Sequence, residues 1–247
     1  MDFDFEVKDE IGYVKFLKAL KSVSKNETIE DKKRHIAILN TKQEVIGISM
    51  ANIRAFAKKI SKTCSEDFLK FSVSKNKDEE FYEETLIQGL VIAEMKDFQK
   101  QTFWLQKWIK KIDNWSTCDS VVTTLKNLKK SEEKKAYFDF YYKLCFSDKE
   151  FVARFGIVVL MVVFLDELHI DLILEMCKNI SNDAYYVQMA IAWLVSIAYV
   201  KFKEKTEKLL KEKTLAKFVQ NKAISKCHDS FQIEKEDKER LKIYRIK

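Results

Sequence analysis

Residues 148–165 read DKEFVARFGIVVLMVVFL, and residues 183–199 read DAYYVQMAIAWLVSIAY. Each stretch opens on an aspartate and continues with apolar residues spaced three and four apart, which is the pattern of an α-helix that packs in a core. The two aspartates are 35 residues apart, and Asp78 and Asp113 continue the same spacing toward the N-terminus. An internal repeat of about 35 residues therefore runs through this part of the chain.

Apolar residues keep the same register in all four segments. When each aspartate is counted as zero, position +8 holds Leu86, Val121, Gly156 and Ile191, and position +12 holds Leu90, Leu125, Leu160 and Val195. Residues four apart lie on one helix face, so this stripe is predicted to form the core. The aspartates stand where a carboxylate favours a helix N-terminus, and we expect them to cap.

Second helices are predicted between the repeat segments, over residues 99–111, 131–146 and 169–180. Earlier helices are predicted over 9–24, 27–40, 50–63 and 65–72, with Ser49 as an N-cap. Strand alternation is not sustained anywhere, and the chain has no proline and four glycines. The predicted fold is all-α, an α-solenoid of HEAT-like helix pairs with a curved, concave surface.

The chain is expected to form a single domain of 247 residues. Its parts are N-terminal helices over 1–75, regular repeats over 76–200 and basic C-terminal helices over 201–247. No Pro, Gly or Ser-rich linker interrupts them. A chain of this length is long enough to bury a sizeable core.

Several classes of protein are excluded by composition. The five cysteines are at least 27 residues apart, so they indicate buried, reduced thiols and no disulfide framework or C-x-x-C motif. The N-terminus is acidic and lacks the features of a secretory signal. The longest apolar run, 151–165, is too short to span a bilayer and contains Arg154. We expect a cytoplasmic protein with no membrane contact.

Positive charge is concentrated in parts of the sequence. Residues 201–247 hold 15 basic and 8 acidic side chains, which equals the net charge of +7 for the whole chain. Residues 51–65 carry four basic side chains and no acid, and residues 99–130 carry seven lysines against two aspartates. Such patches suit a polyanion. The alternative is a solvated lysine-rich surface with no partner.

A second stripe of the repeat carries polar and aromatic residues. In the shared register, Trp115, Asp119, Arg154 and Trp193 occupy positions +2, +6, +6 and +10 of three successive segments. Equivalent helices of a solenoid lie side by side, so these four side chains are expected to converge on the concave surface. The alternative is a partly buried ion pair between Asp119 and Arg154 that only fixes packing, with both tryptophans as packing residues.

At these residues the sequence resembles the DNA alkylation repair family, the HEAT-like alkylpurine DNA glycosylases. The matching stretches are IDNWSTCD at 112–119, FVARFG at 151–156, AIAW at 190–193 and NKAI at 221–224, with weaker similarity in VIGI at 45–48. The resemblance covers most of residues 45–235. The most specific element is Trp-x-x-x-Asp followed 39 residues after the tryptophan by Arg154, with Trp193 a further 39 residues on.

The resemblance implies roles for individual residues. Asp119 matches the catalytic carboxylate, Arg154 its partner arginine, and Trp115 and Trp193 the aromatic contacts to DNA. Three lysines beside these stretches are expected DNA contacts: Lys110, Lys111 and Lys222. One departure from the family pattern is Ser196, where some relatives have an arginine that offers a phosphate contact.

Three functions remain open from the sequence. The first is a DNA glycosylase that hydrolyses the N-glycosidic bond of N3- or N7-alkylated purines in double-stranded DNA. The second is a non-catalytic binder of branched or damaged DNA on the same scaffold. The third is a protein-interaction scaffold with an exposed apolar groove. No nucleotide-binding glycine motif or metal-ligand spacing is present, so we expect no cofactor, no metal and a monomeric protein.

Overall fold

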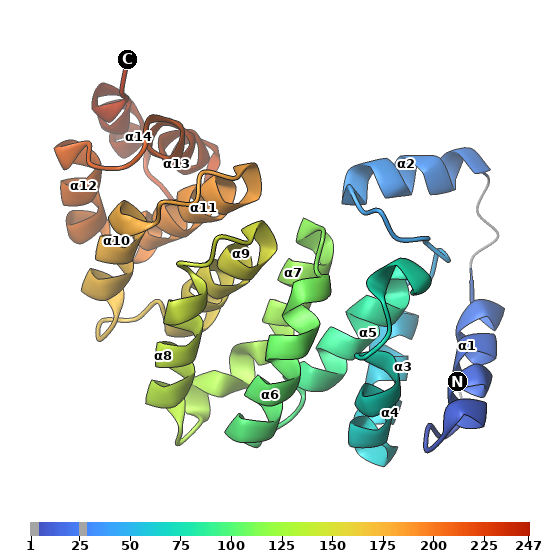
Figure 1. The fold of residues 1–247 in the computed structure, drawn as a ribbon. Coiled ribbons are helices and arrows are strands. Elements are labelled where there is room, and N and C mark those ends of the chain that lie inside the picture. The colour runs from blue at the N-terminus through green and yellow to red at the C-terminus, as the bar shows by residue number, and fades with distance from the viewer. Residues whose placement is uncertain (1–4, 25–28) are drawn as a thin grey trace. The chain divides into compact units, whose positions relative to one another are not determined.

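The structure is a computed structural model that describes residues 5–24 and 29–247, and Figure 1 shows its helices. The chain divides into two compact units, a first unit of Met1–Leu125 and a second unit of Lys126–Lys247. Across the described residues, the only β pairing is a single parallel bridge between Glu44 and Phe81. The predicted all-α class is therefore confirmed.

The described part of the first unit forms the helices α1 (Glu10–Ser22), α2 (Ile29–Leu39), α3 (Met50–Thr63), α4 (Ser65–Ser72), α5 (Tyr82–Ala93), α6 (Phe98–Trp108) and α7 (Trp115–Val122). Short 3-10 segments follow α4 and α6, at Lys77–Glu79 and Ile109–Lys111, and a longer one, Thr123–Lys130, begins after α7 and continues past the end of the first unit. Helix α5 packs against both α3 and α7, so these three helices form a row, and α4 and α6 pack against α5.

The second unit forms the helices α8 (Lys134–Leu144), α9 (Glu150–Val159), α10 (Ile170–Asn179), α11 (Tyr185–Lys201), α12 (Lys203–Glu212), α13 (Lys217–Asp229) and α14 (Lys235–Leu241). A π-helical segment, Leu160–Phe164, continues α9, and a 3-10 segment, Lys242–Tyr244, follows α14. Helix α11 packs against both α9 and α13, which gives this unit a row of its own, visible in yellow to red in Figure 1.

The 35-residue period is present in the helices. Helices α7, α9 and α11 begin at residues 115, 150 and 185. The predicted core stripe is confirmed, because all eight of its residues are buried: Leu86, Leu90, Val121, Leu125, Gly156, Leu160, Ile191 and Val195. The helix-pair organisation follows from this stripe, since each helix of a row needs neighbours to cover its apolar face.

The capping role expected of the four aspartates is wrong. Each precedes its helix by two to four residues, and the N-cap positions belong to Phe81, Asn114, Lys149 and Ala184. At α7 the side-chain oxygen of Asn114 accepts the Thr117 backbone N–H at 2.8 Å. A neighbouring amide thus takes the place expected for Asp113, whose carboxylate is used elsewhere.

The predicted helices agree with the observed ones to within a few residues. Ser49 is the N-cap of α3 and accepts from the Asn52 backbone N–H at 3.3 Å. The helix predicted over 27–40 is α2, and residues 27 and 28 of that prediction lie outside the described residues. The boundary between the two units, after Leu125, falls inside the segment 76–200 that the sequence predicts as continuous repeats.

Gly89 allows α5 to lie close to its neighbours. A Cβ at this position would be 2.2 Å from Cζ2 of Trp108 and 2.7 Å from Cγ2 of Val121. Trp108 is fully buried, and its indole N–H donates to the Thr85 carbonyl at 2.8 Å. Because no larger residue fits here, Gly89 sets how closely α7 packs on α5.

All five cysteines are buried thiols, as expected from their spacing. Burial raises the pKa of both Cys177 and Cys227 to about 12, so these side chains are thiols at neutral pH. Within the described ranges, no helix combines the length and apolar character needed to cross a membrane.

Candidate nucleic-acid interface

Trp115 and Asp119 lie one turn apart on α7. Both side chains are half-buried, whereas Thr117, Cys118 and Val121 of the same helix are buried. Residues four apart share a helix face, so the structure places the indole and the carboxylate together at the partly exposed side of α7. This pair is the first unit's part of the predicted site.

The orientation of Trp115 is held by a hydrogen bond to another helix. Its indole N–H donates to the carbonyl of Ile38, at the C-terminal end of α2, over 3.1 Å. That bond satisfies the only polar atom of the ring and leaves the ring itself half-exposed. Trp115 is thus an aromatic surface in a fixed orientation.

Asp113, the other aspartate of this segment, has a structural role. Its carboxylate accepts from the Thr41 hydroxyl at 2.9 Å and from the Lys42 backbone N–H at 3.1 Å. The ammonium of Lys77 lies 3.7 Å away. These contacts tie the loop after α2 to the start of α7. Asp119 stays the predicted candidate for chemistry.

Arg154 and Trp193 belong to the second unit, on α9 and α11. The Arg154 side chain is buried, and its Nη1 donates to the Tyr186 carbonyl at 3.0 Å. The guanidinium also lies 5.8 Å from the centre of the Tyr186 ring, within the range of a cation–π contact. These contacts fix the guanidinium against the first turn of α11.

Trp193 lines a pocket of about 250 Å³ between α11 and α13. The pocket is also lined by Ser196, Ile197, Val200, Lys226, Asp229 and Ser230. The Ser196 hydroxyl donates to the Trp193 carbonyl at 2.8 Å, so it turns back onto its own helix. Trp193 is half-buried, and its exposed part faces a pocket with a lysine at its rim.

Lys226 is a candidate residue that the sequence reasoning missed. Its pKa is lowered first by burial and then by the positive charges of Lys222 and Arg154. We call Arg154, Lys222 and Lys226 the second-unit cationic cluster. The signal in the sequence was the four-residue spacing of Lys222 and Lys226, which places both lysines on one face of α13. The carboxylate of Asp229, which lines the same pocket as Lys226, opposes the lowering of the Lys226 pKa, so it offsets part of the positive charge that would attract an anion.

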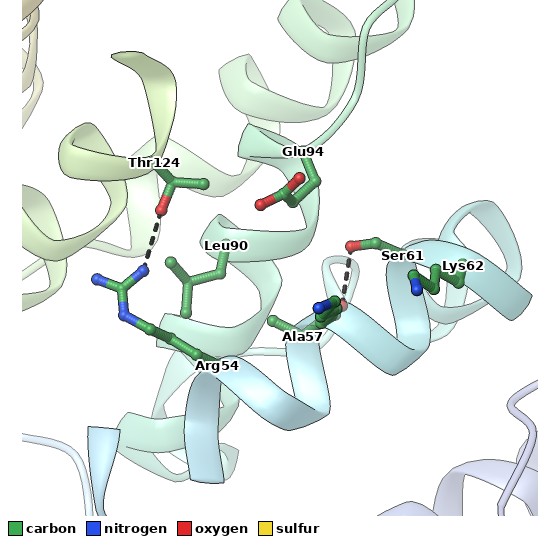
Figure 2. Close-up of a pocket in the computed structure, with 8 residues that line it drawn as sticks. Arg54, Ala57, Ser61, Lys62, Leu90, Glu94 and Thr124 are labelled. Atoms are coloured by element: carbon green, nitrogen blue, oxygen red, sulfur yellow. Dashed lines mark hydrogen bonds between the residues drawn. The ribbon is translucent and has the colours of Figure 1, made fainter. Parts of the chain in front are cut away.

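A second group of cations follows one face of α3. Arg54, Lys58 and Lys62 are spaced four apart and exposed, and we call them the α3 basic stripe. They line a pocket of about 350 Å³ together with Ala57, Ser61, Leu90, Glu94 and Thr124 (Figure 2). The Arg54 guanidinium donates to the hydroxyls of Thr123 and Thr124, both at 3.3 Å. The stripe lies in the basic segment 51–65 noted from the sequence.

The two lysines expected to contact DNA before α7 have different environments. Lys110 is exposed. Lys111 is buried, and its ammonium donates to both carboxylate oxygens of Glu80 at 2.8 and 2.9 Å and to the Ser72 carbonyl at 3.0 Å. Because its donors are all used inside the first unit, we withdraw Lys111 as a DNA contact.

The structure thus groups the predicted residues by unit. Trp115 and Asp119 share a face of α7, and Arg154, Trp193 and Lys222 lie in the row of α9, α11 and α13. The convergence of Trp115, Asp119, Arg154 and Trp193 stays a prediction. Among the described residues, no group of three or more His, Cys, Asp or Glu side chains is arranged to hold a metal ion.

Comparison with known proteins adds evidence from the whole chain. The family model described as DNA alkylation repair enzyme matches residues 16–227. No curated protein and no solved structure matches the chain. The matched range includes the candidate residues of both units.

Proposed function

Because the chain belongs to the DNA alkylation repair enzyme family, we propose that it is a DNA glycosylase that releases N3- or N7-alkylated purines from double-stranded DNA. Membership of this family assigns the chain to DNA alkylation repair. The reaction, its substrate and the roles of individual residues are inferred here from the candidate site. In this function the chain acts as a monomer and without a cofactor.

The chemistry requires little acid catalysis. Alkylation at N3 or N7 makes the base cationic, so the electron pair of the breaking C1′–N bond neutralises it and no proton has to be donated. The sugar becomes cationic as the bond lengthens, and a carboxylate nearby stabilises that charge. Water then adds to C1′ and loses a proton to the solvent or to the carboxylate. Asp119 is proposed as this carboxylate.

The remaining candidates are proposed to bind DNA. The positive charge of Arg154 is proposed to attract a phosphate of the bound DNA. The indole faces of Trp115 and Trp193 attract the cationic base and pack on the sugar. Lys222 and Lys110 are proposed to contact the phosphate backbone, as is Lys226 of the second-unit cationic cluster.

One observation carries this proposal: a half-exposed carboxylate lies one turn from a half-exposed indole inside the segment that the family model matches. The other aspartate of the same segment, Asp113, is occupied by Thr41 and Lys42. The two aspartates are six residues apart in the same segment, which makes them a matched pair for mutagenesis.

The test compares Asp119→Asn with Asp113→Asn on methylated duplex DNA, with freed 3- and 7-methylpurines as the readout. We expect Asp119→Asn to lower the excision rate by about 100-fold or more, since it removes the charge that faces the transition state. Duplex affinity should stay within about twofold. Asp113→Asn should excise at close to the wild-type rate but unfold at lower temperature. Equal excision by the wild type and Asp119→Asn would refute the catalytic assignment.

The alternative is a non-catalytic binder of branched or damaged DNA. The observation that favours it is Ser196, whose hydroxyl is bonded to its own helix where some relatives are expected to offer an arginine. If the wild-type protein releases no methylated purine yet binds junctions more tightly than duplex in a salt-dependent way, this alternative replaces the glycosylase.

A further inference from the structure

Four aromatic side chains form a continuous row in the second unit. The ring centres of Phe151 and Tyr186 are 5.3 Å apart, those of Tyr186 and Tyr185 are 5.2 Å apart, and those of Tyr185 and Phe218 are 6.1 Å apart. Phe151 is the second residue of α9, Tyr185 and Tyr186 begin α11, and Phe218 is the second residue of α13. The aromatic row therefore follows the N-terminal ends of three helices that pack side by side.

The far end of the aromatic row faces solvent. The exposed fraction is 57% for Tyr185 and 41% for Phe218, and Phe151 and Tyr186 are half-buried. Core aromatics of the same unit, such as Tyr137 and Phe155, are fully buried. A connected group of exposed rings is uncommon on a protein surface unless it binds something.

Cations line a pocket beside Phe218. Phe218 lines an open pocket of about 550 Å³ with Lys217, Asn221, Lys222, Ser225 and Arg245, and no acidic residue is among these lining residues. The N-terminal end of α13 adds partial positive charge at this pocket, whereas at the start of α11 the Glu150 carboxylate accepts the Tyr186 backbone N–H at 2.8 Å. The pocket therefore combines the Phe218 ring with three cations, Lys217, Lys222 and Arg245.

The position of Arg245 at this pocket is held by hydrogen bonds. The side chain of Asn221 donates to the Ile246 carbonyl and accepts the Ile246 backbone N–H, both at 2.9 Å. Arg245 itself donates to the Ser225 hydroxyl at 3.0 Å. These hydrogen bonds hold the residues after α14 against α13, so the guanidinium of Arg245 stays at the pocket that Phe218 lines.

From this juxtaposition we infer that the aromatic row and its pocket bind an unpaired segment of DNA. Bases freed from a duplex expose their faces and stack on aromatic side chains, while paired bases offer only their edges. Tyr185 and Phe218 would stack on successive bases, and Lys217, Lys222 and Arg245 would contact their phosphates. This inference goes beyond the proposed function, because stacking on an unpaired strand needs no excision.

The experiment measures the binding of a labelled single-stranded oligonucleotide and of a duplex of equal length by fluorescence anisotropy, using the full chain. Base stacking contributes enough that the Tyr185→Ala/Phe218→Ala variant should bind the single strand at least about tenfold more weakly. Its affinity for the duplex should change by less than about twofold. Arg245→Ala should weaken single-strand binding and reduce its dependence on salt.

Two further variants make the result specific. Tyr185→Leu/Phe218→Leu keeps the apolar bulk, removes the aromatic faces, and should show the same loss for the single strand. Phe231→Ala removes an aromatic of the same unit that is 103% exposed and outside the aromatic row, and should bind like wild type. Unchanged single-strand affinity in the leucine variant, or an equal loss for single strand and duplex, would overturn the inference. Failure of base excision would leave it standing.

Discussion

Two adjacent lysines, Lys110 and Lys111, show how strongly the surroundings of a residue decide its role. Lys110 is exposed, whereas Lys111 is buried against Glu80. Burial lowers the pKa of Lys111, although Glu80 opposes that shift, and burial raises the pKa of Glu80. Gln88 donates to the same carboxylate at 3.0 Å. This group of contacts joins the end of α6 to the start of α5.

Replacing Lys111 by methionine should destabilise the first unit. The substitution leaves Glu80 buried without its cation, and breaking a buried ion pair from one side costs about 3–5 kcal/mol. The free energy of unfolding, measured by urea denaturation, should fall by that amount. Lys110→Met is the matched control and should change it by about 0.5 kcal/mol or less. If both variants unfold at the same urea concentration, the contacts of Lys111 contribute little to stability.

At the scale of an element, α14 is attached to the second unit by the buried Leu241, by packing on α13 and by a charged network. Arg240 donates to the two carboxylate oxygens of Glu207 at 2.7 and 2.9 Å and to Asp237 at 2.6 Å. The hydroxyls of Tyr199 and Tyr244 also donate to Glu207. The helix is only seven residues long, so these contacts, and not its own propensity, are expected to hold it in place.

This network should make the attachment of α14 sensitive to acid. Hydrogen bonds from Arg240 hold the pKa of Glu207 below its usual range, and Lys203, followed by Arg240, does the same for Asp237. A lowered carboxyl pKa stabilises the fold above the ordinary value of about 4, and the stabilisation is lost as the pH falls through the lowered pKa.

Arg240→Met should therefore lower the free energy of unfolding by about 1 kcal/mol at pH 7, and the difference from wild type should shrink below about pH 4. Urea denaturation at pH 7 and at pH 3 measures both values. Lys242→Met removes an exposed pair with Glu239 and serves as the control, with little effect at either pH. If the free energies of unfolding of wild type and Arg240→Met differ as much at pH 3 as at pH 7, the ionised carboxylates of Glu207 and Asp237 do not account for the stabilisation.

At the scale of the whole molecule, positive charge is distributed unevenly between structural parts. The excess of +7 resides in residues 201–247, which include α13 with Lys222 and Lys226. The first unit adds the α3 basic stripe, three exposed cations on one face. Polyanion binding by such surfaces releases counterions, so it depends steeply on salt.

Removing the α3 basic stripe should reduce the salt dependence of duplex binding. Each phosphate contact adds about 0.9 to the slope of log affinity against log salt, so Arg54→Ala/Lys58→Ala/Lys62→Ala should lower that slope by about 3. The control removes three lysines that pair with neighbouring acids, Lys70→Ala/Lys135→Ala/Lys178→Ala. Both variants carry a net charge of +4, so equal slopes would show that only net charge matters.

Much of this architecture could be predicted because it depends on short-range pattern. Apolar residues three and four apart predict each helix and its buried face, and the 35-residue period predicts which helices are equivalent. The same register predicted that Trp115 and Asp119 share a helix face, because residues four apart on a helix lie on one side of it. Their partial exposure is seen in the structure.

The sequence by itself therefore determined the helices, their repeat and the core stripe, because a helical pattern is a property of neighbouring residues. Only the tertiary structure decided that Lys111 is buried, that Asp113 binds Thr41, and that Tyr185 meets Phe218 at a surface. These contacts join residues 31 to 72 positions apart, and their partners come from separate helices and loops. Packing between helices selects such pairs, and the local pattern of either partner does not reveal the other.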